Sequence, residues 1–213
     1  MAPPKRGSRL IEAERGSLQA RKSASTRRQI VEAALECLTE VGYTATTTTM
    51  VAERARVSRG AMLHHYPSRR DIVRAVVDHL HDKRLRAFRT AAASVPPGNG
   101  RLRRMLEGYW QQIQHPLYRV FIELSVLSRT DLELAEILAP VQRAFDREIR
   151  RLALELLPEW RGLGERFEAG FEVGMLVMDG AALSMVRHGR VPRKERLLNY
   201  LELRLQEIAG RAL

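Results

Sequence analysis

The sequence lacks several features that whole classes of protein need. It has one cysteine, Cys37, which excludes an intramolecular disulfide framework and suits a reducing compartment. β-branched residues are sparse outside one threonine run, so helices are favoured over sheets. The basic N-terminus has no apolar segment after it, so no secretory signal is predicted. The longest apolar stretch, Val173 to Val186, is about 14 residues long and contains Asp179, whereas a membrane span needs about 20. We therefore expect a soluble, cytoplasmic protein without a membrane segment.

Motifs of catalysis are also missing. There is no glycine-rich phosphate loop, no metal-ligand spacing and no nucleophile motif, so we expect neither an enzyme nor a cofactor. His79 and His81 stand two residues apart in a predicted helix, which points their side chains in nearly opposite directions. They are therefore expected to be solvated rather than to bind one metal ion.

Positive charge is concentrated at one end of the chain. The formal net charge is +11, from 36 Lys and Arg against 25 Asp and Glu. Residues 1–70 hold 13 of the basic residues and only 6 of the acidic ones. A basic end on a nearly balanced body is typical of a nucleic-acid-binding protein. A solvated basic tail without function is the alternative interpretation.

Apolar periodicity and capping residues predict an all-α fold of about nine helices, with no strand and no internal repeat. Residues 1–24 are predicted to be a flexible basic arm. Thr26 is expected to cap the first helix, which Gly42 ends. Residues 94–100 form the strongest break. The predicted helices span residues 26–41, 47–55, 58–65, 69–93, 102–113, 117–127, 131–156, 165–188 and 193–211.

Two short helices near the N-terminus carry the most specific pattern. They are separated only by Arg56 and Val57, and Ser58 is placed to cap the second. This arrangement predicts a helix-turn-helix at about residues 47–66. Its second helix projects with Arg59, Ala61, His64 and His65 pointing outward, as a helix that enters a DNA major groove does.

The run from Thr46 to Ile72 reads TTTTMVAERARVSRGAMLHHYPSRRDI, and it resembles the TetR family of bacterial transcriptional regulators. The resemblance is specific over about residues 25–85. Beyond them the chain resembles the family only in its architecture and its length. The resemblance implies a DNA-binding domain at 25–85 and a ligand-binding and dimerisation domain at 86–213. The matching positions are Thr47, Val51, Ala52, Ala55, Val57, Ser58, Gly60, Met62, His65, Tyr66, Ser68 and Arg69.

The resemblance also implies roles at the DNA. Free N–H groups at a helix start bind anions, and an arginine pairs with a guanine edge while a methyl group contacts thymine. Arg59 and Ala61 are expected to act in this way on base edges. The implied DNA-binding residues are Thr46, Thr47, His65 and Arg69 at phosphates, and Arg59, Gly60, Ala61 and His64 at base edges.

Two residues depart from the family pattern. Arg56 stands where the family has a turn glycine, so a left-handed conformation there costs about 1 kcal/mol unless the turn is reshaped. Leu63 stands where the family has a tyrosine whose hydroxyl touches a phosphate. That phosphate contact is therefore absent here.

The remaining helices are expected to hold a ligand pocket and a dimer interface. Asp179 lies in an apolar helix, where it faces the pocket, pairs across a dimer interface or takes a local hydrogen bond. Small residues in the same helix are expected to let two backbones approach closely. The predicted pocket residues are Tyr109, Trp110, Ile113, Phe121, Phe145, Met175 and Asp179. The predicted dimer residues are Gly170, Gly174, Ala181, Met185, Leu198, Leu201 and Leu205.

These observations predict a ligand-responsive regulator, a repressor that a small-molecule inducer releases from its operator. The expected partners are a palindromic double-stranded DNA operator, a hydrophobic or amphipathic effector, and a second copy of the chain. The alternative is a DNA-binding regulator that is independent of ligand or is controlled by a protein partner. A purely architectural DNA-binding protein would not need the long, weakly charged helical region that follows the helix-turn-helix.

Overall fold

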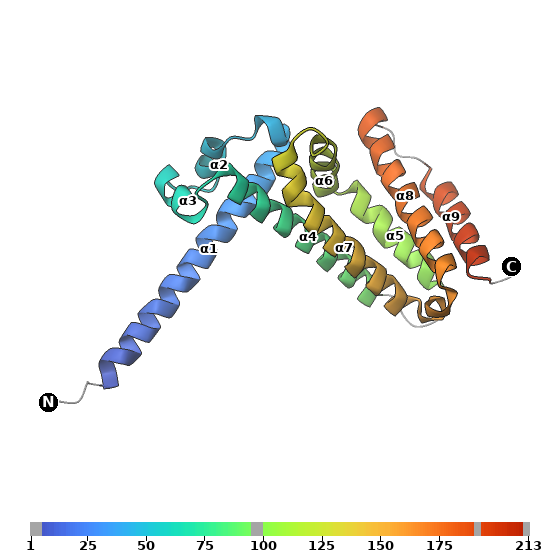
Figure 1. The fold of residues 1–213 in the computed structure, drawn as a ribbon, viewed down its shortest axis with the longest axis horizontal. Helices are drawn as coiled ribbons and strands as arrows, with labels where there is room; N and C mark the ends of the chain where they lie inside the picture. Colours follow the sequence, from blue (N-terminus) through green and yellow to red (C-terminus); the bar gives the residue numbers. More distant parts are fainter. Residues whose placement is uncertain (1–5, 95–99, 190–192, 211–213) are drawn as a thin grey trace. The chain divides into compact units, whose positions relative to one another are not determined.

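The computed structural model describes residues 6–94, 100–189 and 193–210, and over these residues it is all-α, as predicted. It forms two compact units, residues 1–76 and 77–213, which divide inside one helix (Figure 1). The helices are α1 (Arg6–Ala45), α2 (Thr48–Arg54), α3 (Arg59–His65), α4 (Arg69–Ala93), α5 (Arg101–Gln114), α6 (Pro116–Leu127), α7 (Leu132–Leu156), the 3₁₀ helix η1 (Pro158–Leu163), α8 (Glu165–His188) and α9 (Lys194–Ile208).

The first unit contains α1 to α3 and the start of α4. Reciprocal hydrogen bonds between Ser68 and Asp71 cap α4, which confirms the predicted Ser68 cap. Glu40 and Arg54 tie α1 to α2 by two contacts of 2.5 Å. The buried apolar residues of this unit come from all four helices, and they include Ile30, Ala34, Cys37, Leu38, Val51, Met62, Ile72 and Val76.

The start of the first helix was predicted wrongly. Residues 6–24 are helical and continue without a break past Thr26, whose hydroxyl donates to the carbonyl of Lys22 one turn earlier. Thr26 is therefore inside a helix and not at its cap. The segment has few helix-breaking residues, and a helix forms there although no apolar face marks it. Residues 1–5 of the predicted arm lie outside the described residues. At Gly42 the backbone leaves the helical region, with φ of 79°, where the sequence predicts the end.

The second unit is built around α5, α8 and α9, which contact one another (Figure 1). Its core includes Trp110 and Tyr118, whose side chains are almost fully buried. Asp131 caps α7 as predicted, since its carboxylate accepts from the N–H of Leu134 at 2.9 Å. Of the predicted loop at residues 94–100, residues 95–99 lie outside the described residues.

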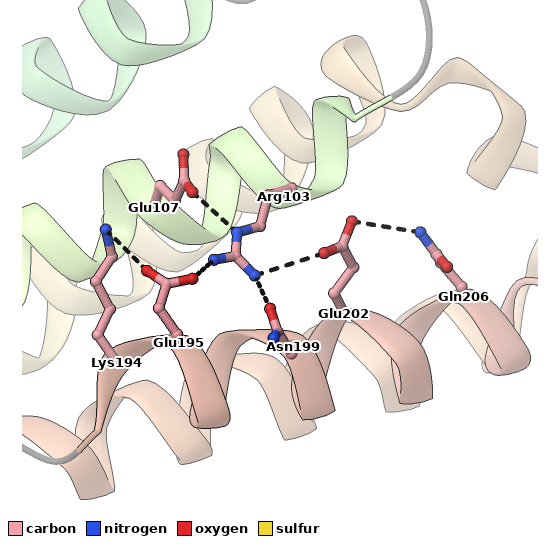
Figure 2. A network of polar contacts seen from close by, with 7 residues as sticks. All are labelled: Arg103, Glu107, Lys194, Glu195, Asn199, Glu202 and Gln206. Carbon is pink, nitrogen blue, oxygen red and sulfur yellow. Dashed lines mark hydrogen bonds and ion pairs between the residues drawn. The ribbon is translucent and has the colours of Figure 1, made fainter.

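Figure 2 shows a polar network along the outer seam between α5 and α9. Arg103 of α5 donates to Glu107 on its own helix at 2.9 Å, and to Asn199 and Glu195 of α9. Glu202 lies 3.7 Å from the same guanidinium. A guanidinium presents several donors in one plane, so a single arginine fixes the register of the two helices.

Helix α8 is both long and apolar. By length and composition alone it could cross a membrane, a test that core helices of soluble proteins also pass. In the second unit it contacts α5, α6, α9 and η1. These contacts account for the apolar residues on its buried face, while other apolar residues of α8 remain exposed.

Candidate nucleic-acid interface and ligand cavity

Two side-chain caps define the helix pair of the first unit. The hydroxyl of Thr47 accepts from the N–H of Met50 at 3.2 Å at the start of α2. The hydroxyl of Ser58 accepts from the N–H of Ala61 at 3.1 Å at the start of α3. Both predicted caps are therefore confirmed. Each cap satisfies one of the free N–H groups at a helix start and leaves others available to an anion.

The turn between α2 and α3 passes through Arg56, which has φ of 53°. This left-handed conformation was one of the two predicted outcomes, and it is unusual for a residue with a side chain. The turn is held from α1, since Gln29 donates to the carbonyl of Ala55 at 2.8 Å. Gln29 therefore supports the turn.

The predicted base-reading residues lie on an accessible face of α3. Arg59, Gly60 and His64 are exposed, and Ala61 is half-buried. The exposed side of α3 also carries Leu63, which is 40% exposed and offers an apolar surface where the family has a phosphate-binding hydroxyl. A backbone with exposed N–H groups, a guanidinium and an imidazole offers hydrogen-bond donors to DNA.

The predicted phosphate-binding residues flank this face. His65 lies with His64 in a groove that also contains Lys22 of α1. The Arg69 guanidinium lies 4.5 Å from the centre of the Tyr43 ring and donates to the Tyr43 carbonyl at 3.1 Å. These contacts hold the arginine against the first unit while it stays exposed. Thr46 donates to the carbonyl of Gly42 at 2.7 Å, and Thr47 is exposed beside it.

The second unit contains an apolar cavity of about 100 Å³. It lies among α4, α5, α7, α8, η1 and α9, and nearly all of its surface is apolar. Two aromatic rings at one end, Phe88 and Tyr109, pack with their centres 5.1 Å apart. Other residues around the cavity include Leu102, Met105, Ile149, Leu152, Trp160, Phe171, Gly174, Met175 and Leu205.

The predicted pocket residues are divided between this cavity and the neighbouring core. Tyr109 and Met175 line the cavity. The other five do not line it. Four of them lie in the core beside it, and Asp179 lies at an exposed position from which its carboxylate reaches two buried tyrosines: Trp110, Ile113, Phe121, Phe145 and Asp179. The sequence missed Trp160, which lies in the short helix η1, because the segment was predicted to be a loop.

Asp179 accepts hydrogen bonds from α5 and α6, at positions 70 and 61 residues away along the chain, so these bonds are not the local one that the sequence left open. Its carboxylate accepts from the hydroxyl of Tyr109 at 3.0 Å and also from that of Tyr118. Burial raises the pKa of both tyrosines above their usual value, so both hydroxyls remain protonated and donate at neutral pH.

A buried cation beside these tyrosines was not predicted. Arg84 of α4 is only 4% exposed, and its guanidinium lies 4.0 Å from the ring centre of Phe121 and 4.1 Å from that of Phe145. The sequence does contain a signal, because Arg84 stands between Leu80 and Phe88 on one helical stripe. A charged residue on an apolar stripe marks a buried charge.

His81 is also buried, one turn before Leu85, and the prediction of a solvated side chain was wrong. Its ring nitrogens lie 2.9 Å from the carbonyl oxygen of Val77 and 3.2 Å from the side-chain oxygen of Gln142. Burial lowers the pKa of the imidazole. The helix carries both an exposed and a core face, and His81 belongs to the core face. No group of residues suited to a metal ion occurs within the described parts of the chain.

The predicted dimer residues belong to the inside of the protomer. A Cβ atom at Gly170 would lie 3.4 Å from Leu205, so the glycine admits α9 of the same chain. Gly174 faces the same leucine at 3.8 Å. The remaining predicted residues are buried or half-buried in the core, namely Ala181, Met185, Leu198, Leu201 and Leu205.

A different face of α8 is left uncovered. The exposed apolar residues of α8 follow one another at intervals of three, seven and three positions, which places them on one stripe of the helix. Gly180, between them, has open space where a Cβ would stand. The stripe, here called the α8 stripe, consists of Val173, Leu176, Leu183 and Val186.

Comparisons with known proteins agree with this geometry. The profile described as "Bacterial regulatory proteins, tetR family" matches residues 30–76, which contain the helix-turn-helix. An uncharacterized HTH-type transcriptional regulator of Mycobacterium tuberculosis is 26% identical over 165 residues, 78% of this chain and 85% of the relative. The HTH-type transcriptional regulator CymR of Pseudomonas putida is 27% identical over 129 residues, 61% of this chain and 62% of CymR.

Solved structures share the fold. A transcriptional regulator from Rhodococcus sp. Rha1 is 22% identical, with a TM-score of 0.66 over 86% of this chain and 96% of that one. The multidrug binding protein EbrR, crystallised with ethidium, is 16% identical, with a TM-score of 0.64 over 84% of this chain and 98% of EbrR. Residues 30–76 therefore match the helix-turn-helix of the TetR family, and over most of its length the chain is similar to bacterial HTH-type transcriptional regulators.

Proposed function

We propose that this regulator represses transcription as a homodimer on a palindromic operator, and that a small molecule in the cavity of the second unit releases it. The observation that carries the proposal is the presence in one chain of an exposed recognition helix and an apolar cavity. EbrR, which shares the fold, was crystallised with ethidium, and this supports a ligand for the cavity. The proposed place of action is the cytoplasm.

In the proposed complex, α3 lies in the DNA major groove. Arg59, Gly60, Ala61 and His64 face base edges, because they occupy its accessible side. The phosphates are bound from the flanks, where basic side chains and free helix N–H groups lie. The proposed phosphate contacts are Thr46, Thr47, His65 and Arg69. Basic residues at the start of α1 add affinity that does not depend on sequence.

The α8 stripe is the proposed dimer interface, in place of the residues predicted from the sequence. Leu176 is 70% exposed, and apolar residues of this size repeated along one helix favour contact with another protein surface. Gly180 gives a partner helix room to approach. A twofold dimer presents two recognition helices, which match major grooves about 34–36 Å apart on a palindromic site.

The size of the cavity suggests how ligand binding affects DNA binding. About 100 Å³ is less than the roughly 300–1,000 Å³ of typical ligand sites, so a larger molecule must move the walls. One wall residue, Phe88, belongs to α4, which also forms part of the first unit. A ligand that shifts α4 therefore acts on the helix-turn-helix domain if it prefers the DNA-incompetent state.

The proposal is tested by selecting binding sites from random double-stranded DNA with the purified protein. We expect an enriched palindrome with two half-sites, bound by one or more dimers. A panel of apolar and amphipathic compounds is then titrated against the labelled site, and release is followed by fluorescence anisotropy. Compounds that bind the protein but never release DNA would favour the regulator that answers to a protein partner.

A further inference from the structure

The second unit contains a buried guanidinium, two of whose nitrogen atoms have no acceptor among the described residues. Arg84 is 4% exposed, and its Nε and Nη1 atoms have no hydrogen-bond partner within the described residues. Three aromatic rings surround it, with ring centres 4.0 Å away for Phe121, 4.1 Å for Phe145 and 4.9 Å for Tyr118. The rings stabilise the cation through their faces but accept no conventional hydrogen bond from it.

The two carboxylates that act electrostatically on this guanidinium, Asp179 and Asp146, already accept hydrogen bonds from other residues. Asp179 accepts from the hydroxyls of Tyr109 and Tyr118. Asp146 accepts from the side-chain amide of Gln142 at 2.7 Å. A buried charge without a matching acceptor is costly, and an arginine cannot relieve the cost by losing its proton. A site in which donors are buried and unpaired is suited to an incoming anion.

The guanidinium lies next to the apolar cavity. Phe88 follows Arg84 by one helical turn and lines the cavity. The Phe88 ring centre lies 6.3 Å from that of Phe145, the same ring that packs against Arg84. Phe88 therefore lines the cavity on one side and packs on the other against a ring that contacts Arg84.

We infer that the effector is an amphipathic carboxylate, whose apolar body fills the cavity and whose carboxylate pairs with Arg84 after Phe88 moves aside. The inference rests on the proposed function, because it takes the cavity to be the effector site. It adds the chemical class of the ligand and the residue that recognises it. A neutral molecule of the same shape leaves the guanidinium unpaired and binds more weakly.

The test compares two probes of matched shape, 4-phenylbutyrate and 4-phenylbutanol, by isothermal titration calorimetry on the full chain. Wild-type protein is expected to bind the carboxylate about ten- to a hundredfold more tightly than the alcohol, the range of a charge-assisted hydrogen bond. Arg84→Met, which has similar length and no charge, should lose this preference. Arg84→Lys, which keeps the charge but not the planar donor set, should retain part of it.

Two controls separate recognition from folding. Arg84→Met should keep the melting temperature of the unliganded wild type or exceed it, because an unpaired buried charge is removed. Phe88→Ala leaves Arg84 in place and removes the ring that has to move aside in the proposed complex. It should therefore strengthen binding of the carboxylate more than that of the alcohol. This variant tests the inference even if Arg84→Met does not fold.

The outcomes distinguish the inference from the proposed function. Equal affinity of wild type for both probes, or a carboxylate preference that persists in Arg84→Met, overturns the inference and leaves the cavity as a ligand site. Binding of neither probe overturns the inference and also argues against the cavity as the effector site. Acetate that matches the affinity of 4-phenylbutyrate identifies a small-anion site instead and overturns the inference. Operator binding is measured separately and is unaffected by these results.

Discussion

At Arg56 the chain turns through a conformation that a glycine adopts more easily. Its φ of 53° lies in the left-handed region, where a side chain crowds the following carbonyl. We expect Arg56→Gly to raise the free energy of unfolding by about 1 kcal/mol, because the strain is removed. Urea denaturation measures the change. Glu53→Gly, in the neighbouring helix, should instead lower stability, and a loss in both variants would contradict the strain argument.

Arg59 and Arg69 provide a pair of arginines with different proposed partners. Arg59→Ala should cost about 1–3 kcal/mol of operator affinity and relax the preference mainly at one base pair in each half-site. Arg69→Ala should weaken all DNA sequences about equally, because a phosphate carries no base identity. Binding of both variants to a library of operator substitutions separates the two roles. A uniform loss in both would make Arg59 a phosphate contact.

At the scale of the element, α8 divides its apolar residues between two faces. One face meets α5 and α9, and the other carries the α8 stripe. Leu176→Glu should therefore leave the protomer folded but dissociate the dimer, and operator affinity should fall with it. Sedimentation velocity measures the oligomer. Leu132→Glu, at an equally exposed leucine of α7, is the matched control and should remain dimeric. A dimeric Leu176→Glu protein would place the interface elsewhere.

At the scale of the whole molecule, filling the cavity should imitate the effector. Gly174 lines the cavity, and a Cβ there makes only an ordinary contact of 3.8 Å with Leu205. Gly174→Ala should therefore keep operator binding and gain up to about 1 kcal/mol of stability from helix propensity. Gly174→Leu should lower operator affinity about tenfold if it favours the released state by about 1.4 kcal/mol. Anisotropy and thermal unfolding follow the two effects. A Gly174→Leu protein with full affinity and normal stability would argue against coupling through the cavity.

The sequence by itself determined where most helices lie and where the helix-turn-helix is. Local signals are sufficient there, because caps such as Ser58 and Asp131 act within one turn and apolar spacing reports a single face. The left-handed conformation of Arg56 could also be predicted from the sequence. A residue with a side chain at the family's turn-glycine position has few conformations to adopt. The start of α1 was missed because a helix of good helix formers needs no apolar face to form.

Only the tertiary structure decided which side chains meet. Gly170 and Gly174 admit α9 of the same chain, although their spacing equally suits a second subunit. Trp110 and Phe145 enter the core while Trp160 lines the cavity, because the rotation of each helix about its axis is set by its neighbours. The aromatic surroundings of Arg84 were likewise decided by the tertiary structure. The rings of Phe121 and Phe145 lie more than thirty residues away along the chain, and periodicity within one helix carries no information about contacts between helices.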